Sequence, residues 1–170
     1  MDHSAIAALT GKSVARILAE GGSGSWVLDP RHARRQRYLV CVRNDNNREP
    51  EANEPHGAAF LIGKANGLVR LPDQNGMARW RITFPEYATV AIPGVWKGWR
   101  NPVRYTRLED LGIDPDELSF EPAPPVGPID TSGVHEDGRE IGKLTIAQAK
   151  AGLAAMFDVS PDAIEITIKA

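Results

Sequence analysis

The chain has 170 residues, of which 42% are apolar and 25% charged, which is the composition of an ordinary globular protein. No apolar run approaches the ~20 residues of a membrane span, and no signal peptide is recognisable at the N-terminus. A single cysteine, Cys41, excludes an internal disulfide and, with the other features, predicts a cytoplasmic protein.

The formal net charge of -2 hides an uneven distribution of charge along the chain. Residues 26–107 hold 14 Lys and Arg against 7 Asp and Glu, whereas residues 108–170 hold 4 against 13. A basic segment followed by an acidic one indicates that the basic part binds nucleic acid. The alternative is that the two segments neutralise each other within the fold.

Residues 1–25 predict an N-terminal helical arm. A helix is expected over residues 4–20, with a break near Thr10 that would divide it into two shorter helices. The apolar side chains that would share its inner face are Ile6, Leu9, Val14, Ile17 and Leu18. The Gly and Ser residues at 21–25 predict a flexible end to the arm.

Residues 26–120 predict a small mixed β-barrel-like sheet with short flanking helices, so the chain is expected to have an α+β fold. Asp29 and Pro30 are typical of a helix start, as N-cap and first helical residue. The segments whose β-branched and aromatic content predicts strands are 38–43, 57–64, 67–71, 78–84 and 87–92. The polar residues at 44–56 predict a mobile loop between the first two strands.

Two details of this domain follow from local patterns. Alternation in the fourth strand places Trp80, Ile82 and Phe84 on one face, so Trp80 is expected in the core. A short helix is expected at 107–111, capped by Thr106 before it and Gly112 after it, with one more helical turn at 114–118.

Residues 96–107, the aromatic-basic stretch, hold three aromatic side chains and four cations in twelve positions. Interleaved rings and cations favour a nucleic-acid surface, because cations bind phosphates and rings stack on unpaired bases. The residues predicted to bind nucleic acid are Trp96, Lys97, Trp99, Arg100, Arg104 and Arg107. The alternative is a loop in which Arg stems lie over Trp rings and pack a small core.

The C-terminal part predicts a separate unit. Residues 121–138 begin with four Pro in eight positions and predict a semi-rigid linker. Residues 139–170 predict a small β-α-β unit, in which Thr145 and Gln148 form a capping box. Such a unit is too small to be stable alone, so it is expected to dock on the main body or on another protein.

Several strings between residues 38 and 111 resemble the PUA-like superfamily and, within it, the EVE domains. They are Tyr38-Leu39-Val40, Ala59-Phe60-Leu61-Ile62-Gly63, Pro102-Val103 and Leu108-Glu109-Asp110-Leu111. The resemblance implies a small mixed β-barrel-like sheet whose cleft holds a modified or flipped base. The chain departs from the family where such domains open with Tyr-Trp, because Leu39 follows Tyr38 here.

Residue patterns for catalysis are largely missing from the sequence. The four His are scattered without metal-ligand spacing, and Cys41 lies inside a predicted strand as an inert thiol. Gly11-Lys12-Ser13 matches only the end of a phosphate-binding loop, because Ile6 stands where the motif needs its first Gly. Acidic residues near 109–110 and 114–117 are expected to be a solvated face rather than a metal site.

No catalytic residue, metal or cofactor is therefore predicted, and an enzyme is the less favoured class. The favoured function is a nucleic-acid-binding module that uses the aromatic-basic stretch. The alternative is a protein-interaction, inhibitor or accessory protein that acts through the acidic unit at 139–170. The sequence leaves the oligomeric state and the choice between DNA and RNA open.

Overall fold

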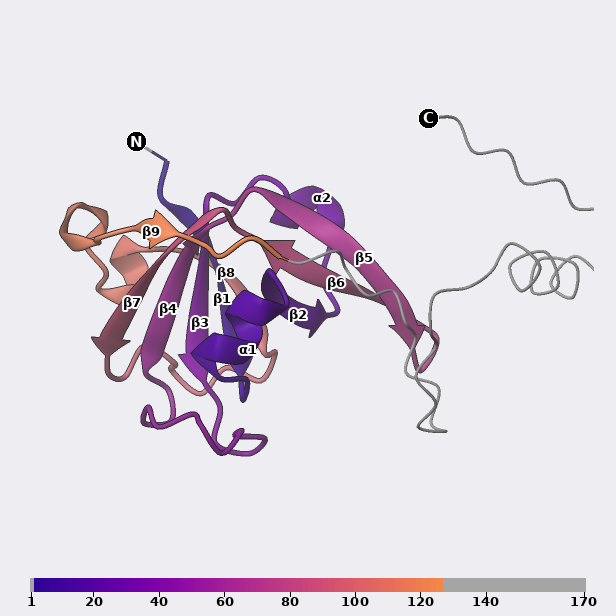
Figure 1. Cartoon of the computed structure of the whole chain (residues 1–170), viewed down its shortest axis with the longest axis horizontal. Helices are drawn as coiled ribbons and strands as arrows, with labels where there is room; N and C mark the ends of the chain where they lie inside the picture. The colour runs from indigo at the N-terminus through magenta and orange to yellow at the C-terminus, as the bar shows by residue number, and fades with distance from the viewer. Residues whose placement is uncertain (1, 127–170) are drawn as a thin grey trace, which may run out of the picture. The chain divides into compact units, whose positions relative to one another are not determined.

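The computed structural model describes residues 2–126 (Figure 1). The predictions for the β-α-β unit at 139–170 and for most of the linker lie outside the described residues. None of the helices in the described part is long and apolar enough to cross a membrane.

The described chain is mostly β, with short helices between strands. Its strands are β1 (Ser4–Thr10), β2 (Gly22–Trp26), β3 (Tyr38–Arg43), β4 (Ala59–Lys64), β5 (Gly67–Gln74), β6 (Met77–Thr83), β7 (Glu86–Ile92), β8 (Val103–Arg107) and β9 (Glu121–Pro122). Its helices are α1 (Val14–Ala19) and α2 (Pro30–Ala33), with 3-10 helices η1 (Glu109–Leu111) and η2 (Pro115–Glu117).

Six strands form the larger sheet, in the order β8-β1-β3-β4-β7-β9. β1 runs parallel to β3, and the other neighbours are antiparallel. Within residues 2–126 this sheet has β8 at one edge and β9 at the other, so it does not close into a barrel. The prediction of a mixed sheet with flanking helices is confirmed, but the barrel-like closure that was predicted with it is not found in the described residues.

The second sheet is antiparallel and has the order β2-β6-β5. Figure 1 shows its β5–β6 ribbon extending away from the six-stranded sheet. Ile82 and Phe84 are buried as predicted, while Trp80 is half-buried farther out along the ribbon. The turn between the two strands is at Asn75 and Gly76, both with positive φ.

The prediction of a helix over residues 4–20 is wrong for its first half, which forms β1, an inner strand of the larger sheet between β8 and β3. Residues 5–8 are fully buried, because the two faces of the sheet are both covered. A short apolar run that is buried on both faces has no period that separates strand from helix. The second half does form a helix, α1, with Ser13 as its N-cap.

The predicted flexible end at 21–25 is also wrong, because these residues enter β2 and pair with β6. A Cβ atom on Gly22 would lie 2.2 Å from the carbonyl oxygen of Ile82. The glycine thus permits close approach of two backbones, which is one established use of glycine in strands.

Apolar side chains form one cluster on each face of the larger sheet, as alternation along its strands requires. The first cluster lies under α1 and the second sheet and includes Ile6, Ile17, Leu39, Phe60, Leu61 and Ile82. Neither α1 nor α2 contributes to the second cluster, which includes Val40, Val42, Ile62, Val95, Leu108 and Ile113.

Candidate nucleic-acid interface

The aromatic-basic stretch is part loop and part strand. Residues 93–102, the β7–β8 loop, cross the second apolar cluster, and the stretch then continues as β8 along β1. The prediction of a helix capped by Thr106 is wrong, because Thr106 lies within β8. The helix begins later, as η1, and Gly112 ends it in a left-handed conformation as predicted.

Two of the predicted rings meet at an edge-to-face contact. The ring centroids of Trp96 and Trp99 are 4.9 Å apart, with planes at 75°. Both rings are half-buried against the second apolar cluster, and the backbone N–H of Trp96 donates to the carbonyl of Gly57 at 3.0 Å. Such contacts hold the rings in place while part of each stays open to solvent.

Arg104 lies over one of these rings. Its guanidinium carbon is 4.3 Å from the ring centroid of Trp99, and the residue is exposed. This cation–π contact orders the guanidinium on the protein surface and leaves its outer side accessible. The structure therefore brings together three of the six predicted residues, Trp96, Trp99 and Arg104.

The other two cations of the loop are exposed beside this group. The ammonium of Lys97 donates to the carbonyl of Gly94 at 2.9 Å, which tightens the turn. Arg100 is exposed next to Trp99. No ion pair is found for Lys97, Arg100 or Arg104 among residues 2–126, so their charges are available to an external anion.

Arg107 does not join the group. Alternation along β8 places it on the opposite side of the strand from Arg104, and its guanidinium pairs with Glu109 at 3.5 Å. Glu109 in turn lies 2.5 Å from Nδ1 of His3. Arg107 is thereby engaged with the protein's own carboxylate.

Tyr105 was counted in the stretch but not predicted to form part of the site. Its ring is stacked on His32, with centroids 3.9 Å apart and planes at 8°. Its hydroxyl donates to the carbonyl of Asp29 at 3.2 Å, and partial burial raises its pKa. Because 73 positions separate His32 from Tyr105, no local sequence signal links them.

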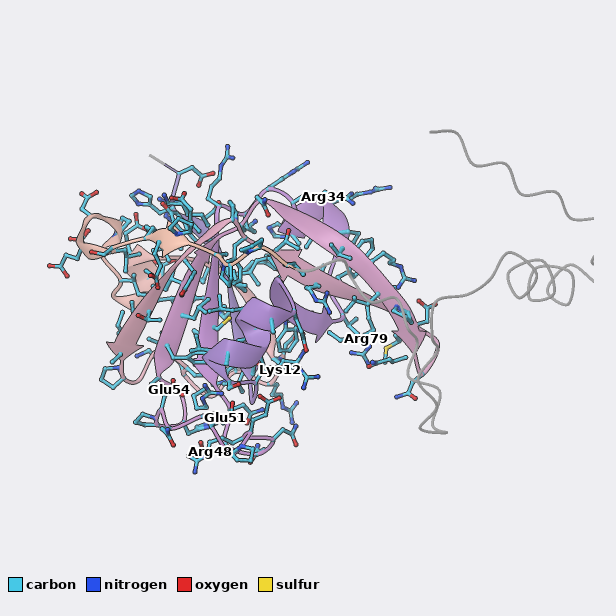
Figure 2. All side chains as sticks on the ribbon, viewed as in Figure 1. Lys12, Arg34, Arg48, Glu51, Glu54 and Arg79 are labelled. Carbon is cyan, nitrogen blue, oxygen red and sulfur yellow. The ribbon has the colours of Figure 1, made fainter. Side chains whose placement is uncertain are left out.

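A further basic surface surrounds α2, which Asp29 caps as predicted. Arg31, Arg34 and Arg35 are exposed, and none has an ion-pair partner among the described residues. Arg34, labelled in Figure 2, lies 5.9 Å from the centroid of Trp80. The sequence shows the several arginines that follow Asp29, but it does not show that α2 lies close to β8.

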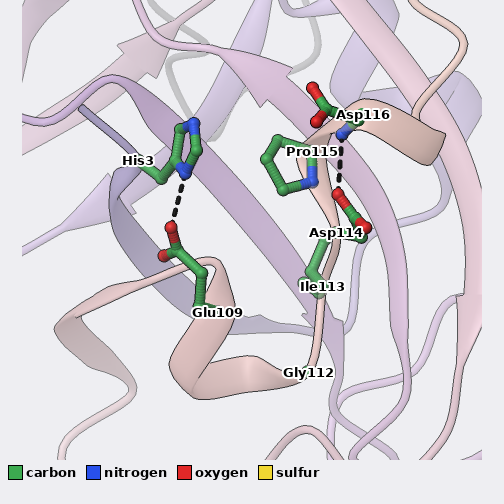
Figure 3. A pocket seen from close by; sticks show the side chains of 7 residues that line it. All are labelled: His3, Glu109, Gly112, Ile113, Asp114, Pro115 and Asp116. Atoms are coloured by element: carbon green, nitrogen blue, oxygen red, sulfur yellow. Dashed lines mark hydrogen bonds and ion pairs between the residues drawn. The ribbon is translucent and has the colours of Figure 1, made fainter. Parts of the chain in front are cut away.

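An open hollow of about 400 Å³ gathers several acidic residues (Figure 3). The hydrogen bond with His3 holds the pKa of Glu109 below its ordinary value. The carboxylate of Asp114 accepts from the backbone N–H of Asp116 at 3.0 Å, which caps η2. In the described part of the chain, no three His, Cys, Asp or Glu side chains are grouped as a metal site requires.

The turn at Gly11-Lys12-Ser13 is occupied by the protein's own side chains. A carboxylate oxygen of Glu49 accepts from the backbone N–H of Ser13 at 2.9 Å, and Lys12 pairs with Glu20 at 2.6 Å. Both groups that would contact a phosphate are therefore engaged. Cys41 is buried within β3, the strand in which it was predicted to lie, and this burial raises the pKa of its thiol to about 12.

Comparisons of the chain with protein-family models, with curated proteins and with solved structures find no match. The function has to follow from the geometry and chemistry of the surface itself.

Proposed function

We propose that the protein binds nucleic acid through the β7–β8 loop and the start of β8, a surface formed by Trp96, Lys97, Trp99, Arg100 and Arg104. The observation that carries the proposal is the stack of Arg104 on Trp99. It presents a flat, ordered cation at an exposed site, with no carboxylate of residues 2–126 paired to it.

The chemistry of this surface fits a strand with accessible bases. Arg guanidinium planes stack on bases that are not held in a helix, and aromatic rings do the same. Lys97 and Arg100 flank the stack and supply positive charge for phosphates. Because the two Trp rings are half-buried and already held in place, little side-chain entropy is lost when a ligand binds them.

Recognition of a modified or flipped base, which the PUA-like resemblance implies, is a narrower form of this proposal. A flipped base exposes its π-face, and the guanidinium of Arg104 over Trp99 offers a planar group on which such a base can stack. We expect a duplex with one unpaired base to bind more tightly than the matched duplex. The alternative partner site at 139–170 lies outside the described residues and stays a prediction.

The test is a binding titration of labelled oligonucleotides at several salt concentrations. Trp99→Ala removes the inner ring and should weaken binding by ~1–3 kcal/mol without changing the salt dependence. Arg104→Gln removes the guanidinium and should also lower the salt slope by about 0.7–0.9 if it contacts one phosphate. Arg48→Gln is the matched control, because Arg48 is exposed on another loop and paired with Asp45.

A melting curve for each variant separates binding from folding. If the surface were only architecture, Trp99→Ala would destabilise the fold by up to ~3–5 kcal/mol, as for a buried Trp. Arg104→Gln would then bind as well as the parent at every salt concentration. That pair of results would overturn the proposal.

A further inference from the structure

A second ring stack lies across β8 from the Trp99–Arg104 stack. Tyr105 follows Arg104 in the strand, and consecutive side chains of a strand point to opposite faces. The ring of His32 lies flat on Tyr105. Since β8 is an edge strand within the described residues, the two stacks lie on the two sides of one exposed edge.

The two stacks share a construction. Each has an inner ring that the fold holds in place: Trp99 packs on an apolar cluster, and Tyr105 bonds to the backbone at Asp29. Each has an outer group that is exposed, Arg104 in one stack and His32 in the other. An exposed planar group fixed on an anchored ring can accept a base with little loss of side-chain entropy.

Cations flank both stacks. Lys97 and Arg100 lie in the loop beside Trp99, and Arg31, Arg34 and Arg35 lie within three positions of His32 in and after α2. No carboxylate of residues 2–126 pairs with any of these five side chains. A polyanion that crosses the β8 edge would therefore meet positive charge on both sides of it.

We infer that the ligand is a single strand of nucleic acid that crosses the β8 edge, with one base on Arg104 and another on His32. A duplex cannot take this path, because its bases are stacked inside and its persistence length is about 50 nm. A single strand bends freely and has bases that can leave the stack. This inference rests on the proposed function and narrows its substrate to strands long enough to reach both stacks.

The test compares strand lengths in one variant pair. Labelled DNA and RNA single strands of about 4 and about 12 nucleotides, within the range of known single-strand site sizes, and a duplex of the longer sequence are titrated against the full chain. His32→Ala removes only the exposed outer ring of the second stack. His56→Ala is the matched control, because His56 is an exposed histidine in the β3–β4 loop.

For the parent and for His56→Ala, the longer strand should bind more tightly than the shorter one. His32→Ala should lose most of this extra affinity for the longer strand. Its affinity for the longer strand should fall by about 5- to 150-fold, which corresponds to the loss of one stacked base. Its melting curve should match that of the parent. The DNA and RNA arms show which strand the surface prefers.

Two results would overturn the inference. The first is that His32→Ala keeps the parent's full gain in affinity for the longer strand, and the second is that the duplex binds as tightly as the single strand. If either occurs while Trp99→Ala still weakens binding, the proposed function stands and the path over β8 is wrong. Failure of every oligonucleotide to bind the parent overturns the proposed function and this inference together.

Discussion

Two loops meet at one end of the six-stranded sheet. Charged contacts anchor one of them, and apolar packing anchors the other. The β3–β4 loop covers residues 44–58, and the β7–β8 loop covers residues 93–102. Their backbones touch where the N–H of Trp96 donates to the carbonyl of Gly57. Both lack regular secondary structure, and both carry charged residues.

Charge anchors the β3–β4 loop. Arg43, at the end of β3, is fully buried, and its guanidinium bonds to Glu54 at 2.6 Å and to the carbonyl of Lys12 at 2.7 Å. The same guanidinium lies 4.0 Å from the ring centroid of Phe60. Glu49 binds the start of α1, and Figure 2 shows Arg48, Glu51 and Glu54 gathered in this loop.

Apolar side chains anchor the β7–β8 loop instead. Val95 is buried, and the rings of Trp96 and Trp99 pack on the same cluster. Its two cations have no carboxylate partner among residues 2–126, and the loop itself contains no acidic residue. The cations of the second loop are therefore not neutralised within residues 2–126, which is why the proposed binding surface is placed on this loop.

The largest expected effect comes from removing the buried cation of the first loop. Arg43→Ala should lower the free energy of unfolding by ~3–5 kcal/mol, because it leaves Glu54 and a backbone carbonyl without their partner. Urea unfolding monitored by Trp fluorescence measures the change. Arg48→Ala is the control and should cost about 0–1 kcal/mol, since its pair with Asp45 is exposed. Equal effects of the two variants would show that the anchor is not Arg43.

A smaller effect is expected where the β3–β4 loop closes over the turn after β1. A Cβ atom on Gly11 would lie 1.8 Å from the carbonyl oxygen of Asn47, and the carbonyl of Gly11 accepts from the N–H of Glu49 at 2.9 Å. Gly11→Ala should therefore push the loop away and cost ~1–3 kcal/mol. Thermal unfolding tests this, and an unchanged melting temperature would mean that the loop does not close on Gly11.

Acid should weaken the first loop more than the second. The hydrogen bond from the backbone of Ser13 lowers the pKa of Glu49 in the folded protein. A lowered folded pKa gives a stabilisation that is present above the unfolded pKa of ~4.3 and lost as the pH falls through the folded value. Glu49→Gln should therefore lose less stability than the parent between about pH 6 and about pH 3.

The measurement is urea unfolding of both proteins across that pH range. Part of the acid sensitivity should remain in the variant, because the pKa of Glu20 is also lowered. Burial opposes that shift, but hydrogen bonds from Lys12 and Arg16 outweigh it. Parallel loss of stability in the parent and in Glu49→Gln would contradict the role given to Glu49.

The sequence predicted those parts of the fold that local chemistry decides. Strands β3, β4 and β7 follow from β-branched runs, and α2 follows from Asp29 and Pro30. β1 was missed because three alanines in its buried run have high helix propensity, and only burial on both faces makes it a strand. Tertiary context overrode local preference there.

The candidate site was predicted in its composition but not in its geometry. Residues 103–107 alternate as a strand does, and this signal outweighs the helix cap predicted at Thr106. That strand decides which cations share a side, and it places Arg107 on the opposite side from Arg104, where it pairs with Glu109. The stack of Tyr105 on His32 depends on the packing of α2 against β8 and has no local signal.

The smallest effect on stability is expected in the β7–β8 loop, at Arg100. The side chain is exposed and makes no ion pair among the described residues, so Arg100→Gln should change the free energy of unfolding by no more than about 0.5 kcal/mol. Its effect on binding should be larger. Loss of one phosphate contact lowers the slope of log affinity against log salt by about 0.7–0.9, which a titration at several salt concentrations measures. A variant that folds like the parent and binds with the parent's salt slope would show that Arg100 contacts no phosphate. Arg43 and Arg100 would then differ only in that Arg43 is buried and stabilises the fold, whereas Arg100 is exposed.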